Sequence, residues 1–405
     1  MRRLRQAVAA IGIWALSLTT GCGNFWVYPG SSSSGTGTTG TGDYVYVANA
    51  NTQTVAGYEV GAGALTAISG SPFPLGFTPT AAVVNPANSI LFVSSGVGIY
   101  SYSITSTGAL ALLSSGLSSG LDDVVSLAVS PDGNWLFALS SVATANVVQV
   151  YEFAINSSTG ALSAVNSSNQ SYSEQYAITA PTSTVPAAPS QIAVAKVSSG
   201  EYLFVALGTG GTLIIPFNTS TGVQVTSPAP PQFSPPSGGA NSNYWANDAL
   251  AVNSSTSVLY VVSSDASSYD GVITAFTIGS NGTSATLTTL ATGATVFQPT
   301  AVVLNSAGTD IYVANTASDS ISGFSTAVSG SSLPALTSSP YLFAYAPTGL
   351  AVDRSGDYLL AIAGAGGPDL TMYSYGSAGQ LSEAASTNTG NGTEPAGAIA
   401  IAATH

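Results

Sequence analysis

Carboxylates are the only side chains in this chain that are numerous enough to build an acid–base or metal site. The 405 residues include 18 Asp and Glu, but only five Lys and Arg, one histidine and one cysteine. The histidine, His405, is the last residue, and we expect it to be a frayed terminus rather than a catalytic base. A hydrolytic site in this chain would therefore have to move protons with Asp and Glu.

Four carboxylates fall close together when the internal repeats described below are aligned. Asp123 and Glu394 share one register position, Asp122 precedes Asp123, and Asp248 lies two residues further along its own repeat. Positions two apart share a sheet face, so we expect a partly polar ring at one end of the fold. Burial or mutual repulsion could raise the pKa of Asp123, Asp248 or Glu394 and let it activate water.

The same four carboxylates allow two other interpretations. Ca²⁺ prefers several oxygen ligands and could bind among Asp122, Asp123, Asp248 and Glu394; otherwise no cofactor is expected. Alternatively, they are solvated loop carboxylates without a chemical role.

Two unusually long segments, 169–188 and 228–246, combine aromatic residues with many prolines. Aromatic rings on stiffened loops could contact a sugar or a peptide, although they could equally pack the loops onto the domain. Gln298 falls at the register position of Asp123. The candidate ligand-binding residues are Asp122, Asp123, Asp248, Gln298, Glu394, Tyr244 and Trp245.

The elements that must position these residues are short strands in seven repeats. Runs rich in aromatic and β-branched residues are typical of strands, and they recur at 44–49, 91–95, 135–141, 202–208, 258–264, 310–316 and 358–364. Each has a companion run before it, at 79–85, 124–130, 189–195, 247–253, 299–305, 347–353 and, at the end of the chain, 395–401. Turns divide each unit into four runs, which suits a four-stranded propeller blade.

The two ends of the repeat array complement each other. The first run, 44–49, lacks a companion before it, and the last run, 395–402, lacks one after it. Pairing them would close a ring and remove an exposed sheet edge. The sequence therefore predicts an all-β fold for residues 43–405: a seven-bladed β-propeller of four-stranded antiparallel blades.

Short motifs add a family resemblance. Tyr46–Asn49 (YVAN) and Tyr312–Asn315 (YVAN) resemble a Y-V-T-N repeat, and Ser130–Gly133 (SPDG) resembles the turn common beside it. The chain resembles the lactonase-type (YVTN-repeat, 6-phosphogluconolactonase-like) seven-bladed propellers. That resemblance implies lactone hydrolysis, a carboxylic ester hydrolase activity, and a His, Arg and Glu set in the channel.

The basic residues do not suit a phosphorylated substrate. Beyond residue 42 the only Lys and Arg are Lys196 and Arg354, and both are expected at the end opposite the long loops. Phosphate binding normally recruits such residues.

The first 42 residues resemble an exported lipoprotein. Residues 1–21 resemble a lipoprotein-type signal peptide, because they combine three arginines with a short apolar run and because Leu18–Cys22 (LTTGC) resembles a lipobox. Residues 22–42 form a Gly/Ser/Thr-rich tether. We expect lipidation of Cys22 and an outer-membrane or cell-surface location, with the membrane contacted through the lipid anchor only.

The net charge of the chain limits the kinds of partner that it can bind. Residues 43–405 carry two basic and 18 acidic residues, a formal charge of −16, which excludes nucleic acid. We therefore expect a monomeric, envelope-tethered, non-catalytic binding or interaction module. Its partner would be neutral or cationic: a small molecule, a glycan, a peptide or an envelope protein. The alternatives are a lactone hydrolase resembling 6-phosphogluconolactonase and a calcium-dependent adhesion module.

Overall fold

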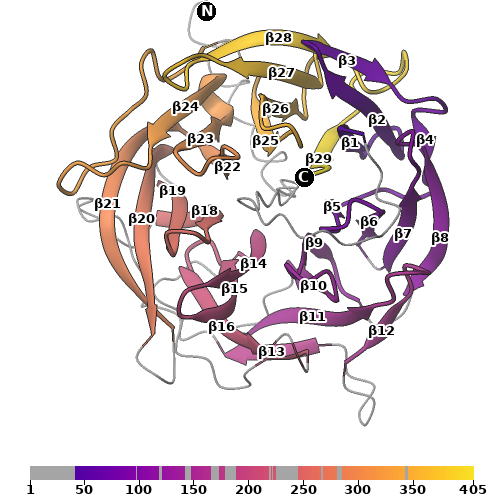
Figure 1. The fold of residues 1–405 in the computed structure, drawn as a ribbon, viewed down its shortest axis with the longest axis horizontal. Helices are drawn as coiled ribbons and strands as arrows, with labels where there is room; N and C mark the ends of the chain where they lie inside the picture. Colours follow the sequence, from indigo (N-terminus) through magenta and orange to yellow (C-terminus); the bar gives the residue numbers. More distant parts are fainter. Residues whose placement is uncertain are drawn as a thin grey trace, which may run out of the picture.

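Seven antiparallel sheets surround one axis in the computed structural model (Figure 1). It describes residues 42–96, 98–117, 121–141, 147–165, 173–177, 188–218, 220, 222–224, 245–265, 268–280, 285–342 and 345–405. Within these ranges the one helical element is a 3-10 turn, η1 (Thr316–Ser318). No helix among the described residues has the length and apolarity needed to cross a membrane.

Each sheet runs from an inner strand near the axis to an outer strand. The first three sheets, in that order, are β29 (Ala398–Ala403), β1 (Tyr44–Asn49), β2 (Thr54–Gly61) and β3 (Ala64–Ala67), with β4 (Phe73–Pro74) on β2; β5 (Ala81–Val84), β6 (Ile90–Ser95), β7 (Gly98–Ile104) and β8 (Leu110–Leu117); and β9 (Val124–Val129), β10 (Trp135–Ser140), β11 (Val147–Ile155) and β12 (Leu162–Ala164), with β13 (Ser173–Ala177) on β11.

The other four sheets continue the same order around the ring. They are β14 (Gln191–Val197), β15 (Gly200–Ala206), β16 (Thr212–Asn218) and β17 (Val223–Gln224); β18 (Trp245–Asn253), β19 (Val258–Asp265), β20 (Asp270–Ser280) and β21 (Ala285–Phe297); β22 (Pro299–Leu304), β23 (Asp310–Asn315) and β24 (Ser320–Ser325); and β25 (Pro347–Val352), β26 (Tyr358–Ala363), β27 (Leu370–Tyr375) and β28 (Leu381–Thr387).

The predicted seven-bladed propeller is confirmed, with two local departures. In the described part of the sixth sheet, isolated bridges from Tyr341 to Ile321 and from Ala335 to Phe324 occupy the place of a fourth strand. In addition, residues 173–177 of the long segment 169–188 form a strand, β13, rather than loop.

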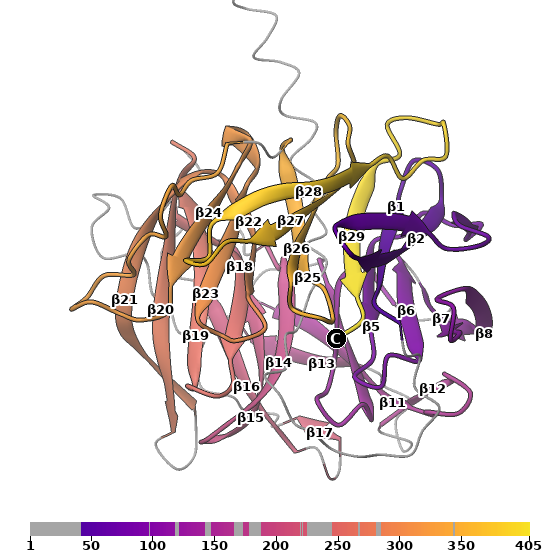
Figure 2. The same ribbon diagram turned by 45° about the horizontal axis from the view of Figure 1, so that its top comes forward.

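The predicted ring closure is also confirmed. β29 pairs antiparallel with β1, with Val45 opposite Ala403, and Thr404 donates its backbone N–H to the Tyr44 carbonyl at 2.8 Å. Figure 2 shows the yellow β29 beside the indigo β1. The expectation of a frayed terminus was wrong, because the His405 backbone N–H donates to Asn88 Oδ1 at 2.9 Å.

Apolar packing between neighbouring sheets explains why the strands form. The described residues contain seven clusters of buried side chains, one in each gap between adjacent sheets. The second strand of every sheet faces such a cluster on both sides, so its sequence is a nearly continuous apolar run. β1 (YVYVAN) is buried along its whole length for this reason.

The tyrosine of each YVAN motif has a structural role. Tyr46 donates its hydroxyl to the Gly108 carbonyl at 2.7 Å, and Tyr312 donates to the Gly379 carbonyl at 2.7 Å. Both glycines lie in the turn between the third and fourth strands of the next sheet. These bonds tie one blade to its neighbour.

We expect Tyr46→Phe to lower the free energy of unfolding by about 1–2 kcal/mol, because a buried carbonyl loses its donor. Tyr312→Phe should cost less, since the Tyr341 hydroxyl lies 3.4 Å from the same Gly379 carbonyl and can donate to it in place of its 3.2 Å acceptor, the Thr337 carbonyl. Urea unfolding of both variants would measure the difference, with exposed Tyr345→Phe as the control. Equal stability of Tyr46→Phe and the parent protein would contradict a stabilising role for the bond between Tyr46 and Gly108.

Candidate functional site

The two ends of the ring differ in charge. The tight-turn end carries the turns from first to second and from third to fourth strands; the long-loop end carries the remaining loops and the links between blades. Lys196 lies at the tight-turn end, 3.3 Å from Glu201. Arg354 follows β25 and His405 follows β29 at the same end. These are the only basic residues in 43–405, so the long-loop end has none.

A β-bulge shapes the long-loop end of the inner strands. Register shifts occur at equivalent places in β9, β18, β22, β25 and β29. The residue preceding the shifted segment has a left-handed backbone in four sheets: Asp123 (φ 45°), Gln298 (φ 53°), Ala346 (φ 40°) and Gly397 (φ 71°). Asp123 and Gln298 therefore share one position, as predicted.

Glu394 does not share that position, so this part of the predicted ring is wrong. Ala398 pairs with Asn49 as Pro299 pairs with Asn315, which makes Gly397 the counterpart of Gln298. Glu394 lies three residues earlier, in the link before β29. The sequence comparison aligned Pro395 with Pro299, whereas the strand starts later because Gly397 adopts the left-handed conformation that glycine accepts readily.

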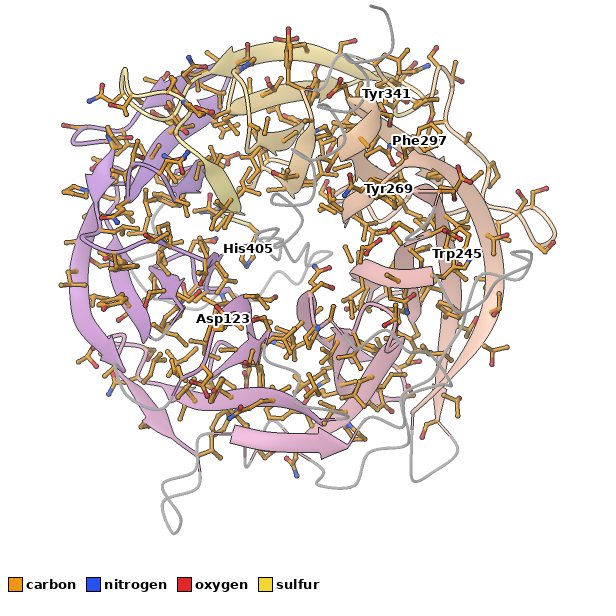
Figure 3. The ribbon with its side chains drawn as sticks, turned by 180° about the vertical axis from the view of Figure 1, so that it is seen from behind. Asp123, Trp245, Tyr269, Phe297, Tyr341 and His405 are labelled. Atoms are coloured by element: carbon orange, nitrogen blue, oxygen red, sulfur yellow. The ribbon has the colours of Figure 1, made fainter. Side chains whose placement is uncertain are left out.

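Asp122 and Asp123 are exposed at the long-loop end, and local bonds hold them there. Ser141 donates its hydroxyl to Asp123 Oδ2. The Asp122 backbone N–H donates to the Tyr151 hydroxyl at 2.8 Å, and its carbonyl accepts from Ser140 Oγ at 2.6 Å. Figure 3 shows Asp123 toward the centre of the ring. Both carboxylates remain open to solvent.

Asp248 lies in the bulge of β18 and differs from the exposed acids. Its Oδ2 accepts a 2.5 Å hydrogen bond from Ser264 Oγ, and its carbonyl accepts from Ser190 Oγ at 2.8 Å, which joins two neighbouring inner strands. Burial raises the pKa of Asp248 to about 8, although the Ser264 bonds favour the ionised form. At neutral pH the carboxyl is mostly protonated, so it is a poor general base there.

The four acids do not form a common metal site. Among the described residues, no three Asp, Glu, His or Cys side chains converge as metal ligands would. The four acids predicted as Ca²⁺ ligands, Asp122, Asp123, Asp248 and Glu394, therefore do not converge on one point in this part of the chain. Glu394 instead lies against Asp369.

Exposed aromatic rings gather at the long-loop end, and the sequence analysis did not identify them. Tyr269 and Phe297 are 47% and 50% exposed, and we call these two the aromatic surface. The Gln298 backbone N–H donates to the Tyr269 carbonyl at 2.8 Å, which places the predicted Gln298 beside it. Figure 3 shows Tyr269 and Phe297 in one sector of the ring. The sequence signal that could have identified Phe297 was its position as an aromatic residue at the end of a strand, β21.

The remaining candidates are less informative. Trp245 begins β18 opposite Asp265 and is half-buried, and its indole N–H has no acceptor among the described residues. Tyr244 and Cys22, together with the first 41 residues and most of the segments 169–188 and 228–246, lie outside the described residues.

No family model matches the chain, and no curated protein matches it. Among solved structures, a Bacteroides fragilis protein provisionally assigned as a 6-phosphogluconolactonase matches with a TM-score of 0.67, at 15% identity over 92% of this chain and 100% of the other. The periplasmic gluconolactonase of Pseudomonas aeruginosa matches with a TM-score of 0.64, at 15% identity over 86% and 96%.

The chain has the fold of the lactonase-type seven-bladed propellers. A Desulfotomaculum acetoxidans protein of unknown function has it too, with a TM-score of 0.61 at 10% identity over 90% of this chain and 99% of the other. At such identities the matches show a shared fold alone. The YVAN and SPDG motifs of this propeller likewise relate to its fold.

A second carboxyl with a raised pKa lies at the tight-turn end of the propeller. Asp43 accepts hydrogen bonds from the backbone N–H groups of Arg354, at 3.1 Å, and Ser355, at 3.0 Å. Burial, reinforced by the neighbouring Asp353 carboxyl, raises the pKa of Asp43 to about 7. Asp43 and Asp248 therefore both hold protons more tightly in the folded chain than in the unfolded chain.

We expect the propeller to be more stable at pH 5.5 than at pH 9. The stability that these protons contribute is complete below about pH 4. It is lost as the pH rises through about 7 for Asp43 and about 8 for Asp248, with a slope of up to about 1.4 kcal/mol per pH unit for each group. Asp248→Asn, which keeps an acceptor for Ser264, should flatten the upper part of this dependence.

Thermal melts from pH 5 to 9 would test this, with Asp122→Asn as the control for loss of an exposed carboxylate. A parent melting temperature that rises toward pH 9 would contradict the assignment.

Proposed function

We propose that this propeller is a non-catalytic binding module whose neutral or cationic ligand docks at the long-loop end. The observation that carries the proposal is the placement of charge: Lys196, Arg354 and His405 all lie at the opposite end. An anionic ligand would meet carboxylates there without a basic partner. A cationic or uncharged ligand has no such penalty.

The aromatic surface favours a glycan as the ligand. Exposed rings offer apolar faces to the C–H faces of a sugar and attract ammonium groups through their π-electrons. Gln298 and the exposed Asp270, which pairs with Phe297, add hydrogen-bonding groups beside the rings. A few polar groups beside apolar surface are typical of sites that fix a ligand's orientation.

We also propose a location for the module in the cell envelope. Lipidation of Cys22 would hold it at the outer membrane or cell surface, and residues 22–42 would act as a tether. The charge of −16 in residues 43–405 would keep the domain away from anionic headgroups. A tethered, negatively charged module suits a partner in the envelope or outside the cell.

Oligosaccharides of different charge provide the test. We expect cationic chitosan oligomers and neutral chitin oligomers to bind in calorimetry, and anionic oligogalacturonate to bind far more weakly or not at all. Phe297→Ala and Tyr269→Ala should each weaken binding by about tenfold, the loss of roughly 1.4 kcal/mol. Leu112→Ala, which removes a 57% exposed side chain on β8, is the matched control.

Tight binding of the anionic oligomer would overturn the charge argument. Unchanged binding in both aromatic variants would show that the ligand docks elsewhere.

The second candidate is a lactone hydrolase acting on neutral lactones. It is favoured by the likeness to the Pseudomonas aeruginosa gluconolactonase and by the half-buried Asp248, whose carboxyl pKa desolvation raises to about 8. If Asp248 were the base that activates water, turnover of glucono-δ-lactone would rise through about pH 8 and would disappear in Asp248→Asn. Turnover that followed this profile would replace the binding module with the hydrolase; turnover unaffected by the substitution would exclude Asp248 as the base.

A further inference from the structure

Asp369 is a buried carboxylate with few hydrogen-bond donors. It lies directly before β27 at the long-loop end and is fully buried. Its Oδ2 accepts the Thr389 backbone N–H at 2.7 Å, and the Thr389 hydroxyl is 3.2 Å away. That hydroxyl has a nearer acceptor, Asn49 Oδ1 at 2.8 Å, and a hydroxyl donates one proton. Among the described residues no donor reaches Asp369 Oδ1, although the Asp369 carboxyl lies close enough to that of Glu394 for the two to share a proton.

Glu394 brings a second carboxylate to the same place. Its Oε1 accepts the Gly390 backbone N–H at 3.1 Å, and its Oε2 accepts the Ala396 backbone N–H at 2.9 Å. These bonds hold the carboxylate against that of Asp369, and its repulsion adds to burial in raising the pKa of Asp369. Glu394 is exposed, so the pair can be reached from solvent.

Within residues 43–405 no basic side chain can neutralise this pair. Lys196, Arg354 and His405 are the only basic residues beyond residue 42, and all three lie at the opposite end of the ring. A buried carboxylate without a counter-charge is strongly unfavourable. A proton or a metal ion from solution can supply the positive charge that residues 43–405 do not place here.

We propose that Asp369 and Glu394 form a Ca²⁺ site between the last blade and the link into the closing strand. Ca²⁺ takes six to eight oxygen ligands in flexible geometry, so two carboxylates and several waters on the Glu394 side suit it better than Mg²⁺, which demands a near-ideal octahedron. The inference is independent of the proposed glycan binding.

The site connects directly to the ring closure. Asn49, at the end of β1, donates its side-chain N–H to the Thr389 carbonyl at 3.3 Å and accepts the Thr389 hydroxyl. A bound ion would thus tie the β26–β27 loop, the link 388–397 and β1 together. Binding that favours the folded state raises the melting temperature.

The test measures Ca²⁺ binding to the purified full-length protein at 150 mM NaCl, by calorimetry and by melting with CaCl₂, MgCl₂ or EDTA. We expect a saturable site, a higher melting temperature in Ca²⁺ than in EDTA, and a smaller effect of Mg²⁺. Asp369→Asn and Glu394→Gln should each weaken Ca²⁺ binding by more than roughly tenfold, because each removes a charged ligand.

Two features keep the test decisive. The Asp369→Asn side chain can still accept the Thr389 N–H and can donate to Glu394, so this variant should fold and melt like the EDTA-treated parent. Glu383→Gln, on β28 of the same blade, removes an exposed carboxylate and should leave Ca²⁺ binding unchanged. Absence of a Ca²⁺ effect on the parent, or full retention of it in Asp369→Asn, would overturn the proposal and leave a shared proton between the two carboxyls.

Discussion

The antiparallel pairing of β29 with β1 converts a row of seven sheets into a ring, and the other contacts depend on it. Each apolar cluster is shared by two neighbouring sheets, including the cluster between the last sheet and the first. Without closure, the sheet containing β1 and one neighbour would each expose an apolar face and an unpaired edge to water. The Thr404–Tyr44 bonds and the Asn88–His405 bond hold the end of the chain in the position that closure requires.

Closure also fixes the chemistry of the two ends. Because every strand reverses direction at a turn, the basic residues after the inner strands are all brought to the tight-turn end, away from the long loops. Carboxylates at the long-loop end are then left without basic partners, and burial raises the pKa values of Asp248 and Asp369 there. A protein of this composition can satisfy such groups with protons, metal ions or cationic ligands, and this shared constraint underlies both proposals above.

The sequence was sufficient for the fold because strand pattern and ring closure are properties of the chain as a whole. Alternating turns and apolar runs predicted seven blades, and the unmatched first and last runs predicted the β1–β29 pairing. The motifs that suggested a lactonase proved to be structural: Tyr46 and Tyr312 bond to carbonyls of the next blade, and Asn49 bonds to Thr389.

The site was harder to predict because it depends on single residues in loops. Aligning Pro395 with Pro299 misplaced Glu394 by three residues, since a left-handed glycine delays the start of β29. The burial of Asp248 in a bulge depends on the partner strand, and the contact of Asp369 with Glu394 joins segments from different strands of the ring. Local sequence patterns contain neither kind of information, whereas the exposed ring of Phe297 could have been suspected from its place at a strand end.

The claim that the long-loop end cannot serve a phosphorylated ligand is tested most directly by a pH-stat assay of the full-length protein with 6-phosphogluconolactone. Since phosphate recognition normally needs Arg or Lys and this end has neither, we expect hydrolysis at the uncatalysed rate. Enzymatic turnover of that substrate would contradict the charge argument and would make the propeller a phosphogluconolactonase in activity as well as in fold.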